Sequence, residues 1–465
     1  MAVARSDDSQ VTDKTPSIHL ESYGCSASLS DSEIVKGILS DAKFHVERHG
    51  DIHSQYTSPD LNIIITCTVK TATEQRMLHR IRELSKTGKP LIVAGCLPKN
   101  EKEIIEKLDP SASMIGPRSL EKTLDVVHGS LNGKRILHLE DDLRPKLLLP
   151  KVRTSKVIDV IQVATGCLSH CSFCATKLAK GHLSSFSPKM VVKQVQTAVN
   201  TGYKEIWLTS TDNGPYGHDI GTNMAYLVTA VTHSKGDFLI RVGMMNPLFI
   251  MKIHHNLIEA YRSPKVFKFL HLPVQSGSDE ILRSMSRGHS AEDFLDIVSA
   301  FRNKFPKIAL STDIIVGFPG ETEEDFESSV NLLKTVHPDT VNLSRFSPRM
   351  GTRAAKMVQV RPEIIKERTQ SLHKIVRAIS QKQNDQWLGY EGSVLIDEKV
   401  RGGFIGRNFA YKPVFLQLSS RDMLGMKVKV KIMSTSSNCL IGTVKNEDCV
   451  KTDSASVKPF QSHGN

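Results

Sequence analysis

The chain of 465 residues contains 39% hydrophobic and 24% charged residues, a composition that supports buried cores and excludes a largely disordered protein. Its eight cysteines are too few for a disulfide-built scaffold, no segment approaches the roughly 18 apolar residues of a membrane span, and the N-terminus lacks the apolar segment of a secretory signal. We therefore expect a cytoplasmic, multidomain protein with reduced cysteines and no membrane partner. The net charge of +12 is uneven, because residues 361–465 hold 17 Lys and Arg against 10 Asp and Glu. This excess indicates a phosphate-rich partner, with solubility alone as the alternative.

A polar tail over 1–15 precedes alternating strand and helix patterns over 16–135. The strand patterns are nearly continuous apolar runs, which are typical of parallel strands buried on both faces. The predicted strands cover 17–23, 61–68 and 90–96, and the predicted helices cover 28–42, 71–88, 101–108 and 119–131. We predict one α/β domain with a parallel sheet, followed by a linker over 136–157 that contains two prolines and several charges.

Six further strand–helix units predict a central domain over 158–386. The predicted strands cover 158–166, 204–211, 238–245, 267–274, 308–317 and 340–348. Six consecutive units favour a partial (β/α)6 barrel, with an open doubly wound sheet as the alternative. In either architecture, polar residues at the C-terminal ends of the strands line the site.

The C-terminal region has a different pattern. A long basic helix pattern over 363–386 is followed by short alternating segments separated by glycine-rich turns. Over 387–450 this pattern predicts a small β-barrel of about five strands, and a polar tail follows over 451–465. The whole chain is therefore predicted to be an α/β protein that ends in a small β-barrel.

Three cysteines lie on one loop after the first strand of the central domain, and we call Cys167, Cys171 and Cys174 the loop set. Their C-x3-C-x2-C spacing favours a soft metal or an iron–sulfur cluster. Zinc usually takes four ligands, and only His170 is a local fourth candidate. Three cysteines on a four-iron cluster leave one iron open for a small molecule, which fits the odd count. Structural zinc and unrelated free thiols are the alternatives.

A second group of cysteines, Cys25, Cys67 and Cys96, follows three successive predicted strands of the N-terminal domain, and we call it the strand-end set. The C-terminal ends of parallel strands meet at one edge of a sheet. We therefore expect the three thiols to collect there, although they are far apart in sequence. The alternative is that each is a buried core cysteine, the usual state of a free thiol.

The loop set with Phe173 resembles the signature of the radical S-adenosylmethionine superfamily, and the whole chain resembles the tRNA methylthiotransferases. TCTVK and GCLP are most similar to the archaeal and eukaryotic branch, which acts on threonylcarbamoyladenosine next to the anticodon. Family members often carry Asn shortly after the first cysteine, where this chain has Ser28. The other stretches that carry the resemblance are ESYGCSASLSDSE, TGCLSHCSFCATKLAKG, HLPVQSGSDEIL, STDIIVGFPGETEEDF and SRFSPRMGTRAAKM.

The resemblance implies two [4Fe-4S] clusters, S-adenosylmethionine and an external electron donor. The cluster on the loop set would cleave S-adenosylmethionine, and the cluster on the strand-end set would hold the sulfur. The residues implied near S-adenosylmethionine are Phe173, Thr209, Ser210, Gln275, Ser276, Gly277, Asp313 and Arg345. Two alternatives remain: a methylthiotransferase for isopentenyladenosine in tRNA or for a ribosomal protein, and a non-catalytic, metal-stabilised RNA-binding protein.

The terminal barrel resembles a TRAM domain, an RNA-binding module. Its segment 401–413 interleaves cations with aromatic rings, as single-stranded RNA loops require. The predicted RNA contacts are Arg401, Phe404, Arg407, Phe409, Tyr411 and Lys412. The alternative is an ordinary barrel loop whose rings belong to the core. We expect a monomer that binds the anticodon stem-loop of tRNA.

Overall fold

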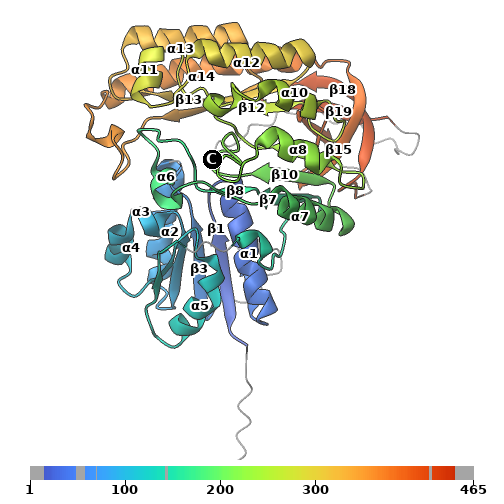
Figure 1. Cartoon of the computed structure of the whole chain (residues 1–465). Coiled ribbons are helices and arrows are strands. Elements are labelled where there is room, and N and C mark those ends of the chain that lie inside the picture. Colours follow the sequence, from blue (N-terminus) through green and yellow to red (C-terminus); the bar gives the residue numbers. More distant parts are fainter. Residues whose placement is uncertain (1–14, 49–57, 70, 142–144, 418–421, 446–465) are drawn as a thin grey trace, which may run out of the picture.

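The computed structural model describes residues 15–48, 58–69, 71–141, 145–417 and 422–445. Figure 1 shows an N-terminal domain at the bottom, a central domain above it and a small β-barrel at the right. The predicted tails over 1–15 and 451–465 fall, apart from Thr15, outside the described residues. No helix among the described residues is long and apolar enough to cross a membrane.

The N-terminal domain is built on a parallel sheet of six strands in the order β2-β1-β3-β4-β5-β6, which confirms the predicted parallel sheet. Its strands are β1 (Ser17–Ser22), β2 (His45–Arg48), β3 (Leu61–Thr66), β4 (Leu91–Gly95), β5 (Ser113–Ile115) and β6 (Leu137–His138). Its helices are α1 (Ser26–Asp41), α2 (Thr71–Ser85), α3 (Leu97–Asn100), α4 (Lys102–Leu108) and α5 (Thr123–Leu131), with a 3-10 turn η1 (Leu120–Lys122). The continuous apolar run of β3 has a simple reason: Ile63 and Ile65 pack into one core and Ile64 into another, on opposite faces of the sheet.

The central domain is a partial barrel. Its six strands pair in parallel and in chain order, as two sheets of three joined by a bridge between Ile240 and Val266. This order confirms the barrel over the doubly wound alternative. The strands are β7 (Ile158–Gln162), β10 (Glu205–Thr209), β11 (Leu239–Val242), β12 (Phe269–His271), β13 (Ala309–Val316) and β14 (Thr340–Arg345).

Helices cover the outside of this partial barrel (Figure 1). They are α7 (Pro188–Asn200), α8 (Met224–Thr232), α9 (Pro247–Ile250), α10 (His254–Tyr261), α11 (Asp279–Ser284), α12 (Ala291–Lys304), α13 (Glu323–Val336) and α14 (Pro362–Asp385). Shorter elements are η2 (Lys146–Leu148), β8 (Ala164–Thr165), α6 (Ala175–Lys180), β9 (Ser184–Ser185) and η3 (Ala354–Lys356). Capping boxes at Ser290 and Thr322 fix the starts of α12 and α13.

The C-terminal region is a closed five-stranded barrel in the order β15-β16-β17-β19-β18, as predicted. The strands are β15 (Glu391–Val400), β16 (Gly403–Arg407), β17 (Pro413–Gln417), β18 (Lys427–Thr435) and β19 (Leu440–Val444). Strand β18 alternates outward lysines with buried Val428, Val430 and Ile432, which explains its period of two. Strand β16 lies within the segment that was predicted to contact RNA.

The small barrel docks on the N-terminal ends of the central strands. Lys412 forms an ion pair of 2.7 Å with Asp339, directly before β14, and Lys427 pairs with Asp237, just before β11. The Arg241 guanidinium stacks on Trp207 and on Tyr411 at 4.8 and 5.3 Å. Because the loop set follows β7, the small barrel and the loop set lie at opposite ends of the central strands.

Candidate functional site

The backbone around the loop set is held by two glycines. Gly166 has a φ of +70°, and a Cβ there would lie 1.9 Å from the His182 carbonyl oxygen, so only glycine fits this close approach. The Cys167 amide donates to the Gly181 carbonyl at 3.2 Å, and Cys174 caps the N-terminus of α6. The loop therefore connects β8 to α6 and carries all three thiols.

Donors surround the sulfur atoms of the loop set. The Ser169 amide donates to Cys167 Sγ, and Arg287 Nη1 donates to Cys171 Sγ, each at 3.3 Å. Burial first, and then the Asp212 carboxylate 4.0 Å away, raise the pKa of Cys167 to about 12. A thiol buried like that of Cys167 ionises only when a cation offsets its burial, and iron supplies that charge in a cluster, so the donor set fits an iron–sulfur group.

The zinc alternative has less support. Among the described residues, no three His, Cys, Asp or Glu side chains converge closely enough to bind a single metal ion. His170, the local candidate for a fourth zinc ligand, is exposed, and its carbonyl accepts from Arg353 at 3.4 Å. A four-iron cluster is larger than one ion and holds its thiolates further apart than a single zinc ion does.

The strand-end set gathers at one edge of the N-terminal sheet, as the sequence predicts. Cys25, Cys67 and Cys96 follow β1, β3 and β4 directly or within a few residues. A Cβ on Gly24 would lie 2.3 Å from Cys67 Cβ, so the loops after β1 and β3 touch. The Cys67 thiol donates a hydrogen bond that lowers the pKa of Cys25, and the same contact raises the pKa of Cys67. Burial first, with a smaller contribution from charge on Cys25, raises the pKa of Cys96 to about 11.

The two cysteine sets face each other across the contact between the N-terminal and central domains. Helix α3, which follows Cys96, packs against α6, which follows Cys174 (Figure 1). Asn100 Nδ2 of α3 donates to the Ala175 carbonyl at 2.8 Å. The Ser26 and Thr209 hydroxyls form a second link at 2.8 Å. The arrangement places two potential clusters at the same end of the central strands.

The residues predicted near S-adenosylmethionine occupy that end as well. Thr209 bonds to Ser26, and Ser210 Oγ donates to Asn213 at 2.9 Å. Asp313 accepts hydrogen bonds from His271 and Asn342 at 3.0 and 2.7 Å. Two further candidates are Phe173, whose ring meets Phe318 edge-on, and Arg345, which is exposed at the end of β14.

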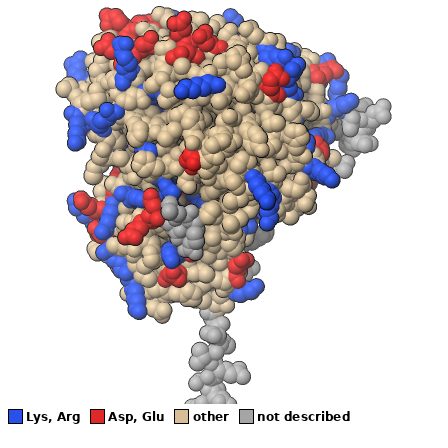
Figure 2. Space-filling model, viewed as in Figure 1, with Lys and Arg blue, Asp and Glu red and all other residues tan. Residues whose placement is uncertain are grey.

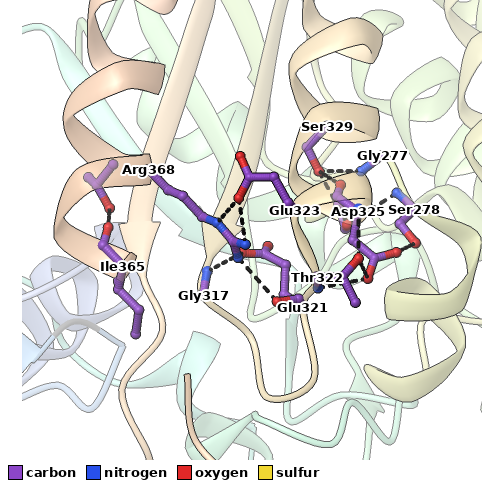
Figure 3. Close-up of polar contacts among 12 residues, drawn as sticks. Gly277, Ser278, Gly317, Glu321, Thr322, Glu323, Asp325, Ser329, Ile365 and Arg368 are labelled. Carbon is purple, nitrogen blue, oxygen red and sulfur yellow. Dashed lines mark hydrogen bonds and ion pairs between the residues drawn. The ribbon is translucent and has the colours of Figure 1, made fainter. Parts of the chain in front are cut away.

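Gln275, Ser276 and Gly277 form one loop at a strand end, and contacts with α13 hold this loop in place. Figure 3 shows the contact that Gly277 makes. Gln275 has a left-handed φ of +80°, and the Gly277 amide donates to Ser329 Oγ of α13 at 2.8 Å. A Cβ on Gly277 would lie 2.4 Å from the Ser328 carbonyl, which requires glycine. Ser276 is buried and its hydroxyl lies 3.3 Å from Ser329 Oγ. Ser276 and Gly277 therefore position the loop, while Gln275 is half-buried at its turn.

Figure 3 also shows how the next strand-end loop is held. Arg368 of α14 donates to Glu321 at 2.9 Å and to Glu323 at 2.8 Å, and Glu321 in turn accepts from the Gly317 amide at 2.8 Å. Ser278 Oγ donates to Asp325 at 2.5 Å. The loops after β12 and β13 are therefore anchored to α13 and α14 by polar side chains.

Four of the six predicted RNA contacts are poorly accessible: Phe404, Tyr411 and Lys412 are buried, and Arg407 is half-buried. Phe404 lies in the core of the small barrel and Tyr411 packs on Phe267 at 4.9 Å. Arg407 pairs with Asp397 at 2.9 Å. Lys412 is buried in the domain contact with Asp339 described above. Arg401 and Phe409 remain accessible.

Comparison with known proteins identifies the family. Residues 161–333 match the model of the Radical SAM superfamily, and residues 17–116 match that of the uncharacterized protein family UPF0004. A probable threonylcarbamoyladenosine tRNA methylthiotransferase of Pyrococcus horikoshii is 40% identical over 431 residues, which cover 92% of this chain and 99% of that protein. The chain belongs to the threonylcarbamoyladenosine tRNA methylthiotransferase family.

Other members and structures agree with this family. The threonylcarbamoyladenosine tRNA methylthiotransferase of Homo sapiens is 32% identical over 453 residues, which cover 95% of this chain and 76% of that protein. The radical S-adenosylmethionine methyltransferase TsrM from Kitasatospora setae superposes with a TM-score of 0.56 at 14% identity, covering 73% of this chain and 76% of that one, which shows a shared fold. Membership in the radical S-adenosylmethionine superfamily implies one [4Fe-4S] cluster and S-adenosylmethionine.

Three polar residues near the two cysteine sets were not predicted from the sequence. Arg287 reaches Cys171, and Asn246 Nδ2 donates to Ser169 at 3.2 Å beside Cys167. Lys180 is buried at the end of α6. Arg287 and Asn246 come from parts of the chain that are distant from the loop set in sequence, so no local pattern marks them. For Lys180 the only signal is its place six residues after Cys174.

Proposed function

We propose that this chain adds a methylthio group to carbon 2 of threonylcarbamoyladenosine next to the anticodon of tRNA. The observation that carries the proposal is the placement of two three-cysteine sets, face to face, at one end of the partial barrel. The names of the similar proteins supply the substrate. They favour it over isopentenyladenosine and over a ribosomal protein, and the two cysteine sets favour an enzyme over a passive RNA-binding protein.

In this proposal the loop set and the strand-end set each hold a [4Fe-4S] cluster through three thiolates. When bound, these groups supply reductive cleavage of S-adenosylmethionine at the loop set and storage of sulfur at the strand-end set. The chain's own side chains position the reactants and exclude water. Arg287 and the Ser169 amide donate to the sulfur atoms of the loop set, and such bonds tune the potential of a cluster.

The contacts to S-adenosylmethionine belong to the strand ends. We assign them to Phe173, Thr209, Ser210, Gln275, Asp313 and Arg345, with Ser276 and Gly277 holding the Gln275 turn. The support is that they share the end of the barrel that carries the loop set. The anchors to α13 and α14 seen in Figure 3 keep two of these loops in place without a ligand, which lowers the entropy lost on binding.

The RNA surface is assigned to accessible basic groups. On the face shown in Figure 2, acidic side chains are most numerous at the top, whereas basic and acidic side chains are mixed over the N-terminal domain and the small barrel. On the small barrel we assign the contact to Arg401, Phe409 and the outward Lys429 of β18, because the other predicted contacts are buried or half-buried. We further propose that the protein acts as a monomer in the cytoplasm with an external electron donor.

Nucleoside mass spectrometry of tRNA tests the proposal. Reconstituted protein, S-adenosylmethionine, a sulfide source and a reductant are incubated with tRNA that carries threonylcarbamoyladenosine. We expect the modified adenosine to gain the mass of one methylthio group less that of the hydrogen it replaces on carbon 2. An unchanged nucleoside, with methylthiolation of isopentenyladenosine tRNA or of a ribosomal protein under the same conditions, would reassign the substrate.

A further inference from the structure

Three exposed apolar side chains lie close to the two cysteine sets in sequence and in space, and we call Val69, Leu178 and Met350 the mouth patch. They are 54%, 45% and 60% exposed. Val69 follows Cys67 by two residues, Leu178 belongs to α6 directly after the loop set, and Met350 lies in the loop after β14. Single exposed apolar residues are ordinary, whereas a group of them on one surface marks an interaction site.

Asn100 of α3 joins the segments that carry Val69 and Leu178. Its Nδ2 donates to the Ala175 carbonyl, in the first turn of α6, at 2.8 Å. The same atom lies 3.5 Å from Oγ1 of Thr68, the residue before Val69. The loop after β3 and helix α6 therefore meet at α3, although they belong to different domains.

The loop after β14 borders the other side of the patch. A Cβ on Gly351, the residue after Met350, would lie 3.1 Å from Leu178 Cδ1, so this loop packs against α6. Arg349, the residue before Met350, forms a buried ion pair with Glu74 of α2 in the N-terminal domain. The three exposed side chains therefore share one surface where the N-terminal and central domains meet.

The charge on the central-domain side of the mouth patch suits a polyanion. Residues 160–204 and 340–362, which include α6 and the loop after β14, each contain five Lys or Arg and no Asp or Glu. Arg353 and Lys356 of the second segment are exposed. Arg353 also donates to the His170 carbonyl at 3.4 Å, so this basic segment reaches the loop set. An apolar surface beside basic segments fits nucleic acid, whose bases stack and whose phosphates are anionic.

The proposed reaction requires that one base leave its stack. Enzymes that act on a base take it out of the stack, and its neighbours then lose a stacking partner. Apolar side chains such as Leu and Met can insert at such a step and replace the lost contact. We propose that the mouth patch packs against the bases that flank the target adenosine of the anticodon loop. The inference rests on the proposed function, which supplies tRNA as the substrate.

The test separates apolar contact from charge. Met350→Ser, Leu178→Ser and the double variant remove apolar surface without changing the charge, Met350→Leu keeps the surface, and Leu148→Ser changes an exposed leucine of the linker as a matched control. The probe is an anticodon stem-loop that carries threonylcarbamoyladenosine, with 2-aminopurine as the next base on its 3′ side. Affinity is measured at several salt concentrations, and 2-aminopurine fluorescence reports whether that base leaves its stack. Iron content and thermal unfolding show whether each variant folds and binds iron, and the single variants decide if the double variant does not fold.

We expect the double variant to bind the stem-loop about tenfold more weakly at every salt concentration, with an unchanged salt slope, because no charge is lost. The rise in 2-aminopurine fluorescence on binding should shrink as well, whereas Met350→Leu and Leu148→Ser should match the wild type. Affinity and fluorescence that are equal in the double variant and the wild type would overturn the inference. If reduction by a reduced ferredoxin were then slower in the double variant, the patch would belong to the electron donor instead.

The nucleoside assay keeps this inference distinct from the proposed function. Binding that depends on the mouth patch but yields no methylthio product would refute the proposed function alone. Product formation with wild-type affinity in the double variant would refute the role of the mouth patch alone.

Discussion

The two ends of the central strands use buried charge in opposite ways. At the N-terminal ends, charged side chains find partners inside the protein: Lys412 pairs with Asp339, and Arg407 with Asp397. At the C-terminal ends, the thiol of Cys167 is buried beside the carboxylate of Asp212. The charges named at the first end are paired within the chain, whereas the cysteines at the second end are proposed to bind groups that the chain does not supply.

The two ends of the central strands should therefore have different roles: one stabilises the fold, and the other supports the activity. A buried pair that loses one member leaves an uncompensated charge, so changes at the N-terminal ends should destabilise the fold. Burial disfavours the charged form of a thiol, so a buried cysteine becomes a thiolate only when a cation binds to it. Changes at the C-terminal ends should therefore remove a bound group and the activity while the fold persists. The predictions below test this division, beginning with the largest effect.

Replacing one cysteine of each set should give two different losses of activity. Cys171→Ala should abolish cleavage of S-adenosylmethionine, because the loop set would lose its cluster. Cys67→Ala should retain that cleavage and form no methylthio product, because only the sulfur site is lost. Chromatographic assay of 5′-deoxyadenosine and of modified nucleoside separates the two. Loss of both activities in Cys67→Ala, with the loop-set cluster intact by spectroscopy, would contradict the division of labour.

Two glycine variants should remove the cysteine sets one at a time. Alanine at Gly24 would place a Cβ 2.3 Å from Cys67 Cβ, and alanine at Gly166 would place one 1.9 Å from a carbonyl oxygen. Together with strain from positive φ, we expect about 2–5 kcal/mol of local destabilisation and loss of about half the iron in each variant. Iron analysis and thermal unfolding measure both effects.

Gly202→Ala is the control for backbone strain, because its φ is +99° but no atom lies within 4 Å of the added Cβ. It should cost about 1–2 kcal/mol and keep all its iron. Equal iron loss in all three variants would show that strain, rather than the packing around the cysteines, determines cluster binding.

At the opposite end, Glu205 should make stability depend on pH. Burial first, and then the Asp397 carboxylate, raise its pKa from 4.5 to about 7. Between these values the folded state binds the proton that the unfolded state has lost, so the free energy of unfolding should fall as pH rises from 4.5 to 7, by at most ~3 kcal/mol. Glu205→Gln should flatten this fall in urea titrations without changing iron content. A slope that persists unchanged in the variant would assign it to other groups.

The smallest expected effect concerns RNA. Replacing Arg401 and Lys429 by Ala should weaken tRNA binding and flatten its salt dependence by about 1.5 in the slope of log K, if both contact phosphate. Lys334→Ala, an exposed lysine on the acidic helix α13, is the matched control. Affinities at several salt concentrations that are equal for all three proteins would move the RNA surface away from the small barrel.

Much of this fold could be predicted because local sequence patterns indicate its strands and helices. The runs of β3 and β4 and the spacing of the loop set are visible in sequence, and the rule that parallel strands end at one edge brought Cys25, Cys67 and Cys96 together. Strands β5 and β6, with three and two residues, are too short to show a pattern.

The sequence analysis misses features that depend on tertiary contacts, because the partners of a side chain are distant in sequence. Arg407 and Lys412 read as exposed cations, but their partners Asp397 and Asp339 come from another strand and another domain. Phe404 points into the barrel core from β16, a strand inside the segment for which RNA contacts are predicted. Arg287 reaches Cys171 only when distant parts of the chain pack together, which no local signal reveals.

The most direct test of the central claim counts the clusters. Iron, acid-labile sulfide and Mössbauer spectra are measured on anaerobically reconstituted full-length chain and on two triple variants, one with the loop set and one with the strand-end set changed to Ala. The account predicts about eight irons per wild-type chain and about four in each triple variant, all as four-iron clusters. A wild-type chain with only four irons, or with zinc in place of one cluster, would contradict it.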